Sequence, residues 1–427
     1  MHPPRPTRRE ALKAAATAGA LTWLPHAHAA GREPTLRVGL VGCGGRGTGA
    51  ACQALAADPA VRLVALADAF GDRLEESLSY LQAESSISGK VDVPPDRRFV
   101  GFDACERLLA SGVDVVLLCT PPQFRPAHLK LAVAAGKHVF AEKPVAVDAP
   151  GVRSVLESAR LAADRGLSIV SGLCLRHDAG FRAAVGRLHD GAIGPVQTLL
   201  ASDYRSGRWS KPRQPGMTEM QYQMRNWYNF TWLSGDFNVE QHVHYLDLCA
   251  WVMQDRYPVR AVGTGGRQVL TEPEYGQIFD HFAVVYEYAD GARLVSQCRQ
   301  QPGCKNDVGL LVIGALGGAE LSERPKGLSI RGTGGGWAYD GPKNQMYQAE
   351  HDALFASIRA GRPINDGASM AKSTLLAIMG RMAAYTGQEV TWEMALNSQD
   401  DLSPARYAWD AAPPPAAVAI PGQTPFR

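Results

Sequence analysis

Residues 34–172 show an alternation of two hydrophobic patterns. Continuous apolar runs typical of buried parallel strands cover residues 38–41, 61–67, 113–119, 138–141 and 167–171. Helical spacing of apolar residues follows from near residue 45 and over 72–82, 125–135 and about 151–165. Strands that alternate with helices in this way predict a parallel sheet covered by crossover helices.

A different pattern begins near residue 173. Strand-like runs predominate, at residues 196–203, 259–264, 282–288, 293–300 and 309–314, and helical spacing returns at 239–254, 346–360 and 368–387. We therefore predict an α/β fold. A parallel N-terminal sheet (34–172) precedes an α/β domain with an open, mostly antiparallel sheet (173–390), and residues 391–427 form an extended tail.

The loop after the first apolar run carries the clearest motif. It reads Gly42-Cys43-Gly44-Gly45-Arg46-Gly47 and opens a helix. Gly42 allows a tight turn, Gly44 lets the backbone approach a pyrophosphate, and Gly47 allows close packing of helix on sheet. The helix that begins near Gly45 and Arg46 directs a partly positive N-terminus at the phosphates. Residues 34–172 are thus predicted to be a dinucleotide-binding Rossmann domain.

An acidic residue completes this motif. Asp68 ends the second apolar run, twenty-one residues beyond Gly47. A carboxylate at this position accepts hydrogen bonds from a ribose 2′-hydroxyl and repels a 2′-phosphate. We therefore predict NAD as the cofactor in preference to NADP.

The first 29 residues have the order of parts of an export signal. Arg8-Arg9 resembles the twin-arginine pattern, residues 14–23 are apolar but too short for a stable anchor, and Ala27-His28-Ala29 is an A-x-A cleavage site. This pathway exports folded proteins, which suits a chain that acquires its nucleotide in the cytoplasm. We predict an exported protein, periplasmic or otherwise outside the membrane, with no membrane anchor after cleavage and a tightly held NAD.

Charge excludes some partners. Removal of residues 1–29 takes away four basic residues and one acidic residue, which turns the formal net charge of +2 into −1. Nothing in this balance favours nucleic acid or an anionic membrane surface as a partner. The eight cysteines include no C-x-x-C pair, so we do not expect the function to depend on cysteine chemistry.

The motifs together resemble the glucose–fructose oxidoreductase/inositol dehydrogenase (Gfo/Idh/MocA) family over essentially all of the mature length. The matching segments are 42–47, Asp68, 119–122, 136–144 and 235–247, among which the Glu142-Lys143-Pro144 element is the most specific. The resemblance implies hydride transfer between nicotinamide and a sugar or cyclitol carbon. It also implies a homo-oligomer, a dimer or tetramer, formed through the sheet of the second domain.

Two strand ends supply candidate residues near the nicotinamide. Lys143 follows a strand at the carboxyl edge of the parallel sheet, where such sheets bind ligands. A lysine there can hydrogen-bond a substrate hydroxyl and assist the loss of its proton, and Glu142 can orient it. Thr120 and Pro121 end the neighbouring strand and are predicted to contact the nicotinamide or its ribose.

A second constellation lies in the predicted helix 239–254. Glu240, His244, Asp247 and Trp251 would share one face by their spacing. The resemblance places Glu240 and His244 at the family's Asp and His positions, the histidine acting as proton acceptor. Histidine suits this task because its pKa lies near neutrality. His242 is predicted to bind substrate or to belong to the core; a metal on His242 and Glu240 remains an alternative, although our prediction is no metal.

Further candidates for substrate binding come from two segments. Arg225, Trp227 and Tyr228 lie in an aromatic-rich stretch, and flat rings suit the apolar faces of sugars. Arg176 follows the last strand of the first domain and is predicted to face the substrate. Packing under a long loop and an interdomain salt bridge are the structural alternatives.

The predicted function is therefore an exported NAD-dependent dehydrogenase that acts on a sugar, cyclitol or glycoside. Two alternatives remain open. One is a redox-neutral, NAD-dependent glycosidase of the α-N-acetylgalactosaminidase type, although such relatives tend to lack the lysine that stands here at Lys143. The other is a non-catalytic sugar-binding accessory protein that keeps the nucleotide fold, since a fold alone does not determine function.

Overall fold

The first sheet confirms the predicted parallel arrangement. The computed structural model describes residues 34–323 and 327–427, and the compact unit comprises Leu36–Arg427. Six parallel strands lie in the order β3-β2-β1-β4-β5-β6. They are β1 (Leu36–Val41), β2 (Val61–Asp68), β3 (Arg98–Val100), β4 (Val115–Leu118), β5 (His138–Ala141) and β6 (Ile169–Ser171). The strand order reverses between β1 and β4, where such sheets open a crevice at their carboxyl ends.

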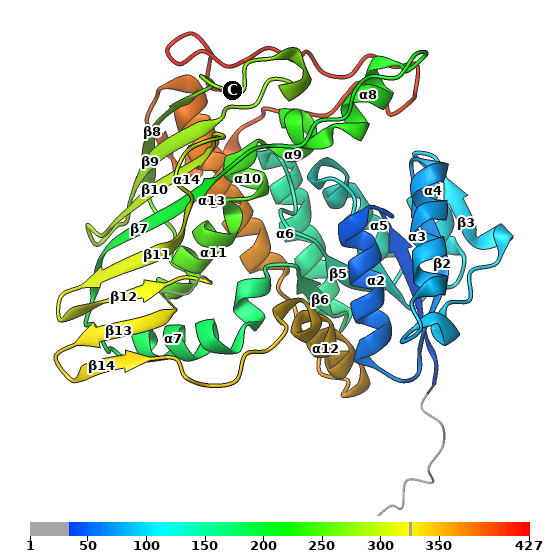
Figure 1. The fold of residues 1–427 in the computed structure, drawn as a ribbon, viewed down its shortest axis with the longest axis horizontal. Helices are drawn as coiled ribbons and strands as arrows, with labels where there is room; N and C mark the ends of the chain where they lie inside the picture. Colours follow the sequence, from blue (N-terminus) through cyan, green and yellow to red (C-terminus); the bar gives the residue numbers. More distant parts are fainter. Residues whose placement is uncertain (1–33, 324–326) are drawn as a thin grey trace, which may run out of the picture. The chain divides into compact units, whose positions relative to one another are not determined.

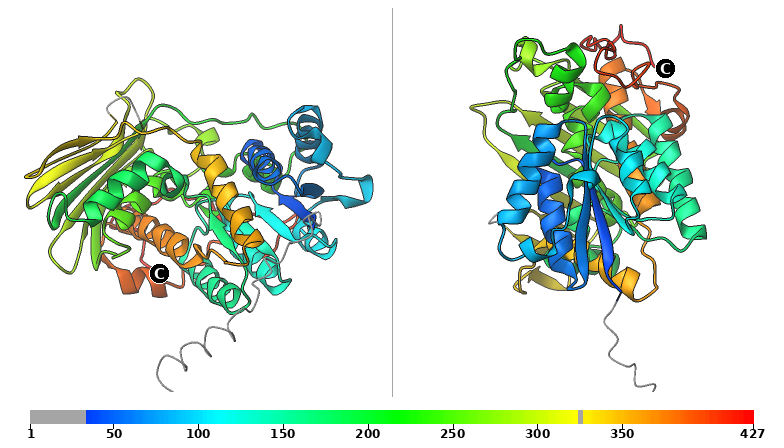
Figure 2. Two further views of the ribbon diagram at one scale, coloured as in Figure 1. Left: turned by 90° about the horizontal axis from the view of Figure 1, so that it is seen from below. Right: turned by 90° about the vertical axis from the view of Figure 1, so that its right-hand side faces the viewer.

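Helices cover both faces of this sheet (Figure 2, right). On one side lie α2 (Gly45–Ala57) and α3 (Gly71–Ala83); on the other lie α4 (Ala104–Ala110), α5 (Arg125–Ala134) and α6 (Ala149–Asp164). A further helix, α12 (Met346–Arg359), returns from far along the chain and packs on α2 and β6. The first domain is therefore completed by residues beyond its predicted boundary at 172.

The second sheet has nine strands in the order β14-β13-β12-β11-β7-β10-β9-β8-β15. Its strands are β7 (Val196–Arg205), β8 (Arg260–Gly266), β9 (His281–Glu287), β10 (Arg293–Gln300), β11 (Asp307–Gly314), β12 (Gly317–Leu321), β13 (Leu328–Gly332), β14 (Gly335–Ala338) and β15 (Val390–Thr391). All neighbours are antiparallel except β7 and β10, which run parallel. The predicted fold class is confirmed.

One face of this sheet is covered and the other is open. Helices α7 (Ala179–His189), α10 (Phe237–Glu240), α11 (Val243–Val252) and α13 (Gly367–Thr386) lie on the side toward the first domain (Figures 1 and 2). No helix in the described ranges covers the opposite face. Along the strands apolar residues alternate between buried and exposed, as a one-sided sheet requires.

The last part of the chain returns to the first domain. After α14 (Trp392–Asn397), residues 398–427 form no further helix or strand and run beside α8 (Glu219–Arg225) and α9 (Thr231–Ser234), as Figure 1 shows in orange to red. In the part of the chain that the structure describes, no helix has the length and apolar character needed to cross a bilayer. The predicted twin-arginine signal lies outside the described residues.

Candidate active site

The glycine loop between β1 and α2 has the geometry that its sequence predicts. Gly42 has φ +96°, and a Cβ atom there would stand 2.6 Å from the backbone of Thr120. A Cβ atom on Gly47 would stand 1.9 Å from the carbonyl oxygen of Gly42. At Gly44 and Gly45, by contrast, an added Cβ would meet nothing within 4 Å, because this side of the loop faces open space. The backbone is thus exposed where a pyrophosphate would approach the N-terminus of α2.

Asp68 is held beside this loop at the end of β2. Its Oδ2 accepts a hydrogen bond from the amide of Cys43 at 2.7 Å, and its Oδ1 accepts one from the amide of Phe70 at 2.8 Å. Burial raises the pKa of the Asp68 carboxyl, and these amide bonds act in the opposite direction. Each carboxylate oxygen keeps a lone pair that can accept a ribose hydroxyl. The structure therefore places Asp68 where the fingerprint requires it.

A cavity of about 630 Å³ runs from this loop to the second domain. Its wall from the first domain includes Gly42, Gly44, Gly45, Arg46, Gly47, Asp68, Thr120, Pro121, Glu142 and Lys143. The second domain contributes Arg205, Trp209, Lys211, Arg225, Trp227, Glu240, Gln241 and His244, and α12 contributes Tyr347. All of the predicted cofactor-binding residues and all three predicted catalytic residues therefore line a single cavity.

Glu142 connects the strand end to the glycine loop. It is 3% exposed, and its Oε1 lies 3.0 Å from Nε of Arg46. Its Oε2 accepts a hydrogen bond from the amide of Lys143 at 3.2 Å. The guanidinium of Arg46 also lies 5.0 Å from the ring centre of Tyr347. Glu142 therefore contacts Arg46 and the backbone amide of Lys143, whereas the predicted orientation of the lysine ammonium falls to Glu240.

Lys143 joins the two domains. Its Nζ donates to the carbonyl oxygen of Glu240 at 2.8 Å and lies 3.2 Å from Glu240 Oε1. Both side chains are largely buried, 13% and 10% exposed. An ammonium group has three N–H donors, so one remains for a ligand in the cavity. The pair places a positive charge at the carboxyl edge of the sheet and keeps it there.

His244 stands in the first turn of α11 and faces the same cavity. Burial lowers the pKa of its imidazole well below the usual value, and the positive charges of Lys143 and Arg205 lower it further. The ring is therefore neutral at neutral pH. Its Nδ1 is buried and forms no hydrogen bond within the described part of the chain. A neutral imidazole beside an ammonium group can accept a proton from a bound hydroxyl.

The single helix predicted over 239–254 is wrong. The chain forms α10, which ends at Glu240, and a separate helix α11, which begins at Val243. The amide of His244 bonds to the carbonyl of Gln241, and the Glu240 carbonyl accepts a hydrogen bond from Lys143. Glu240 and His244 still reach the cavity, but Asp247 and Trp251 do not line it.

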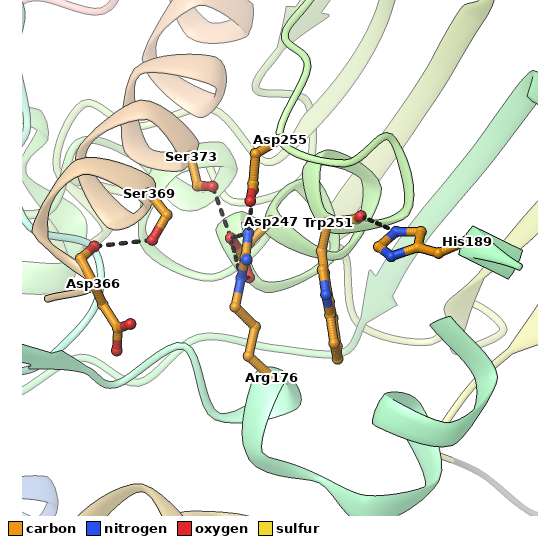
Figure 3. A network of polar contacts seen from close by, with 8 residues as sticks. All are labelled: Arg176, His189, Asp247, Trp251, Asp255, Asp366, Ser369 and Ser373. Carbon is orange, nitrogen blue, oxygen red and sulfur yellow. Dashed lines mark hydrogen bonds and ion pairs between the residues drawn. The ribbon is translucent and has the colours of Figure 1, made fainter. Parts of the chain in front are cut away.

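Arg176 is not a substrate residue in this structure. Its guanidinium bonds to Asp247 at 2.8 and 2.9 Å and to Asp255 at 2.8 Å, and Ser373 donates to Asp247 at 2.7 Å (Figure 3). Trp251 lies beside the guanidinium, 5.7 Å from it. The prediction of substrate contact is corrected to the structural alternative, a salt-bridge network that joins the short helix at Cys174–His177 to α11 and α13.

Two further predicted substrate residues lie in the core. His242 is fully buried; its Nε2 lies 2.8 Å from the hydroxyl of Ser296 and its Nδ1 lies 3.8 Å from Asp203. Tyr228 is 8% exposed, and its hydroxyl accepts a hydrogen bond from Gln300 at 3.0 Å. Neither lines the cavity, because each side chain turns toward the strands of the second sheet. His242 and Glu240 therefore have separate partners and do not converge on one metal position.

Arg225 and Trp227 line the cavity, and their contact with substrate stays a prediction. Arg225 bonds to Asp72 at 2.9 Å and lies over the ring of Phe70 at 4.2 Å. These contacts hold Arg225 against the first domain, near the end of the cavity that Asp68 marks. Trp227 stands beside Trp209, their ring centres 6.2 Å apart.

Several cavity residues had no signal in the sequence. Arg205 ends β7, and its Nε lies 2.5 Å from Asp203. Tyr347 lies in the first turn of α12, more than 300 residues from Arg46 in the chain. Trp209 and Lys211 lie in the loop that follows β7. Only tertiary packing, through the pairing of β7 with distant strands and the return of α12 onto α2, brings these residues to the cavity, so no local motif could identify them.

Comparison with known proteins agrees with the geometry. Residues 36–169 match the model of the oxidoreductase family with an NAD-binding Rossmann fold, GFO_IDH_MocA. An inositol 2-dehydrogenase of Rhizobium meliloti is 26% identical over 347 residues, 78% of this chain and 93% of the relative. An inositol 2-dehydrogenase of Cereibacter sphaeroides is 25% identical and covers 68% of this chain and 74% of its own length.

The fold is also found among solved structures. The aldose–aldose oxidoreductase of Caulobacter crescentus, solved with glycerol, superposes with a TM-score of 0.64 and 20% identity, covering 84% of this chain and 99% of that one. The matches support the Gfo/Idh/MocA resemblance and confirm the predicted enzyme class, an NAD(P)-dependent oxidoreductase acting on CH–OH groups. They do not distinguish NAD from NADP.

Proposed function

We propose that this chain is an exported NAD-dependent dehydrogenase that acts on a hydroxyl-bearing carbon of a sugar, cyclitol or glycoside. The observation that carries the proposal is the meeting of Lys143, Glu240 and His244 in one cavity at the carboxyl ends of the parallel strands. The relatives named inositol 2-dehydrogenase and aldose–aldose oxidoreductase support a polyhydroxylated substrate.

The residues present fit a dinucleotide. The open backbone at Gly44 and Gly45 and the N-terminus of α2 would hold the pyrophosphate, and Asp68 would hold the adenosine ribose. Thr120 and Pro121 would stand beside the nicotinamide ribose. When bound, the nicotinamide supplies the group that exchanges hydride with the substrate carbon.

The protein's own residues then manage the proton. The free N–H of Lys143 donates to the oxygen of the substrate hydroxyl, which lowers the cost of developing negative charge on that oxygen. The neutral imidazole of His244 accepts the proton. Glu240 holds Lys143 in place through its carbonyl and its carboxylate. Trp209 and Trp227 offer flat apolar surfaces to a sugar ring.

A single-turnover spectrum tests the proposal. The mature protein, with the nucleotide that it carries, is mixed with a panel of sugars, cyclitols and glycosides while reduced-nicotinamide absorbance is recorded. A stable rise with one class supports a dehydrogenase and narrows its substrate. Release of free aglycone without a net rise in this absorbance would instead establish the redox-neutral glycosidase. No change in absorbance and no aglycone with any compound, while the nucleotide stays bound, would favour the accessory protein.

The finer cofactor assignment is NAD. A half-buried carboxylate at Asp68, fixed by two amides, would repel a 2′-phosphate. Titration with NADH and NADPH should show NADH binding at least about ten-fold tighter, and Asp68→Ala should narrow that ratio. Equal affinities in the unaltered protein would overturn this assignment.

Export and retention of the cofactor belong to the same proposal. The twin-arginine pattern at Arg8-Arg9 supports export of the folded, loaded protein. Replacement of both arginines by lysine should leave the protein in the cytoplasmic fraction of the cells that produce it. Dialysis should leave the nucleotide bound to the protein. Rapid exchange of the bound nucleotide would refute the proposal that it is tightly held.

We also propose a homo-oligomer, a dimer or tetramer, through the open face of the second sheet. This face exposes Val262, Val285, Leu311 and Ile313, each between 37% and 48% exposed. Contiguous apolar surface of this kind marks association sites. Light scattering should give a mass above that of one chain, and Leu311→Asp should reduce it to the monomer.

A further inference from the structure

Three phenylalanines form the cavity wall on the side of Asp68. Phe70 follows β2, Phe102 follows β3, and Phe124 lies after β4. Each stands in a loop or a short turn at a strand end, so no strand hydrogen bonds fix its position. Asp68 marks this end of the cavity as the place of the adenosine ribose. The positions of these three rings therefore shape the adenosine half of the nucleotide site.

The C-terminal segment 402–411 packs against these rings from outside the cavity. The ring of Trp409 lies 5.0 Å from Phe70 and 4.5 Å from Phe102, measured between ring centres. The ring of Tyr407 lies 5.3 Å from Phe124 and 6.1 Å from Phe102. Neither Tyr407 nor Trp409 lines the cavity itself. Two side chains near the end of the chain thus contact all three phenylalanines.

Hydrogen bonds hold the segment to the first domain. Gln123, the residue before Phe124, donates from Nε2 to the hydroxyls of Ser403 at 2.8 Å and Tyr407 at 3.0 Å. The amide of Leu402 donates to Asp148 Oδ2 at 3.0 Å. The same Asp148 caps the N-terminus of α6. The segment is therefore anchored at defined positions, which the predicted extended surface tail did not anticipate.

The second domain closes the remaining side. Arg225, at the end of α8, lies 4.2 Å from the ring centre of Phe70 and bonds to Asp72. Met224 of the same helix lines the cavity and belongs to a cluster that includes Phe70, Phe102 and Trp409. The adenosine wall is thus held between α8 and the C-terminal segment.

We propose that residues 402–411 form a clasp that positions the adenosine wall and slows release of the nucleotide. The inference rests on the proposed dinucleotide binding. Tyr407 and Trp409 are positioning residues: they touch no reacting atom and act through Phe70, Phe102 and Phe124. Loss of one aromatic pair changes an equilibrium constant by roughly two- to ten-fold, and Trp409 forms two such pairs.

The test compares Trp409→Ala and Tyr407→Ala with Arg406→Ala. Arg406 is a matched control in the same segment, because its side chain is exposed and its guanidinium pairs, among the described residues, with the exposed Asp410. The rate of NADH dissociation is measured by stopped flow from the fluorescence of NADH displaced by excess NAD. We expect about ten-fold faster release for Trp409→Ala, a smaller increase for Tyr407→Ala, and no change for Arg406→Ala.

Two fragments locate the effect within the cavity. ADP-ribose carries the adenosine half and nicotinamide mononucleotide does not. Trp409→Ala should weaken ADP-ribose about ten-fold and leave the mononucleotide unchanged. Equally weakened binding of both fragments, or unaltered rates of NADH release in Trp409→Ala and Tyr407→Ala, would overturn the clasp but leave the proposed dinucleotide site standing. Failure of the unaltered protein to bind either NADH or ADP-ribose would refute the dinucleotide site, and the clasp with it.

Discussion

Replacement of Lys143 by methionine removes the ammonium group that joins the parallel sheet to α10 but keeps most of the side chain's length. In the structure this group donates to the Glu240 carbonyl at 2.8 Å and lies 3.2 Å from the Glu240 carboxylate. If Lys143 also assists proton loss from the substrate, kcat should fall about 10²- to 10⁴-fold. That decrease corresponds to roughly 3–5 kcal/mol of transition-state free energy.

The same substitution leaves the largely buried Glu240 carboxylate without its positively charged partner. Removal of one partner from a fully buried ion pair costs about 3–5 kcal/mol. The Lys143 and Glu240 side chains are 13% and 10% exposed, so we expect about 2–3 kcal/mol of lost unfolding free energy. This loss must be separated from the loss of catalysis.

The double variant Lys143→Met/Glu240→Gln provides that separation. A neutral glutamine leaves no uncompensated charge, so the double variant should recover most of the unfolding free energy while kcat stays low. Urea unfolding and single-turnover rates are measured on the same preparations. A Lys143→Met variant within about three-fold of the original kcat would refute the proton-transfer role. Recovery of kcat in the double variant would show that the unpaired charge of Glu240, and not the missing ammonium group, slowed the single variant.

Three further predictions concern the glycine loop, the histidine and the arginine network. Gly47→Ala should lower the free energy of unfolding of the nucleotide-free protein by about 1–3 kcal/mol, measured in urea, because its Cβ would meet the Gly42 carbonyl at 1.9 Å. Gly45→Ala should lower it little, because an added Cβ there meets open space. Equal losses in the two variants would contradict this steric explanation. His244 has its pKa lowered on folding, so below about pH 6.5 the unfolded chain binds more protons and stability falls as the pH drops. His244→Gln should weaken the dependence of the melting temperature on pH. An unchanged slope of melting temperature against pH would contradict the assigned contribution of His244. Arg176→Met should lower the melting temperature, because the carboxylate of Asp247, 1% exposed, loses its positively charged partner. The substrate KM should not change, and a raised KM would show that Arg176 contributes to substrate binding.

Local patterns determined most elements of the first domain. β5 occupies the predicted residues 138–141, and α5 and α6 lie within a residue or two of their predicted limits. Parallel strands are buried on both faces, so each appears in the sequence as an apolar run between turn residues. The glycine loop and Asp68 were also identifiable, because the conformations and spacings that they need are local.

Residues 239–254 show where local pattern fails. The apolar spacing there satisfies one continuous helix, but the Lys143 ammonium binds the Glu240 carbonyl and the chain divides at that point. The partner lies 97 residues earlier in the chain. The sequence left Arg176 and His242 open between substrate contact and a structural role, because polar residues suited to a substrate suit a buried network equally well; the structure favours the structural role.

The sequence by itself determined a nucleotide-binding loop, its acidic residue, and the lysine and histidine that could move a proton. The loop, Asp68 and the strand-end position of Lys143 depend on backbone conformation or on spacing within a few tens of residues, whereas the role of His244 as proton acceptor came from the family resemblance. Only the tertiary structure decided which side chains share the cavity: Arg205 arrives through the pairing of β7 with β10, Tyr347 through the return of α12, and Trp409 through the final segment of the chain. Such contacts form because apolar surfaces from distant segments are buried together. The periodicity of one segment predicts that it has a buried face, but not which other segment packs against that face.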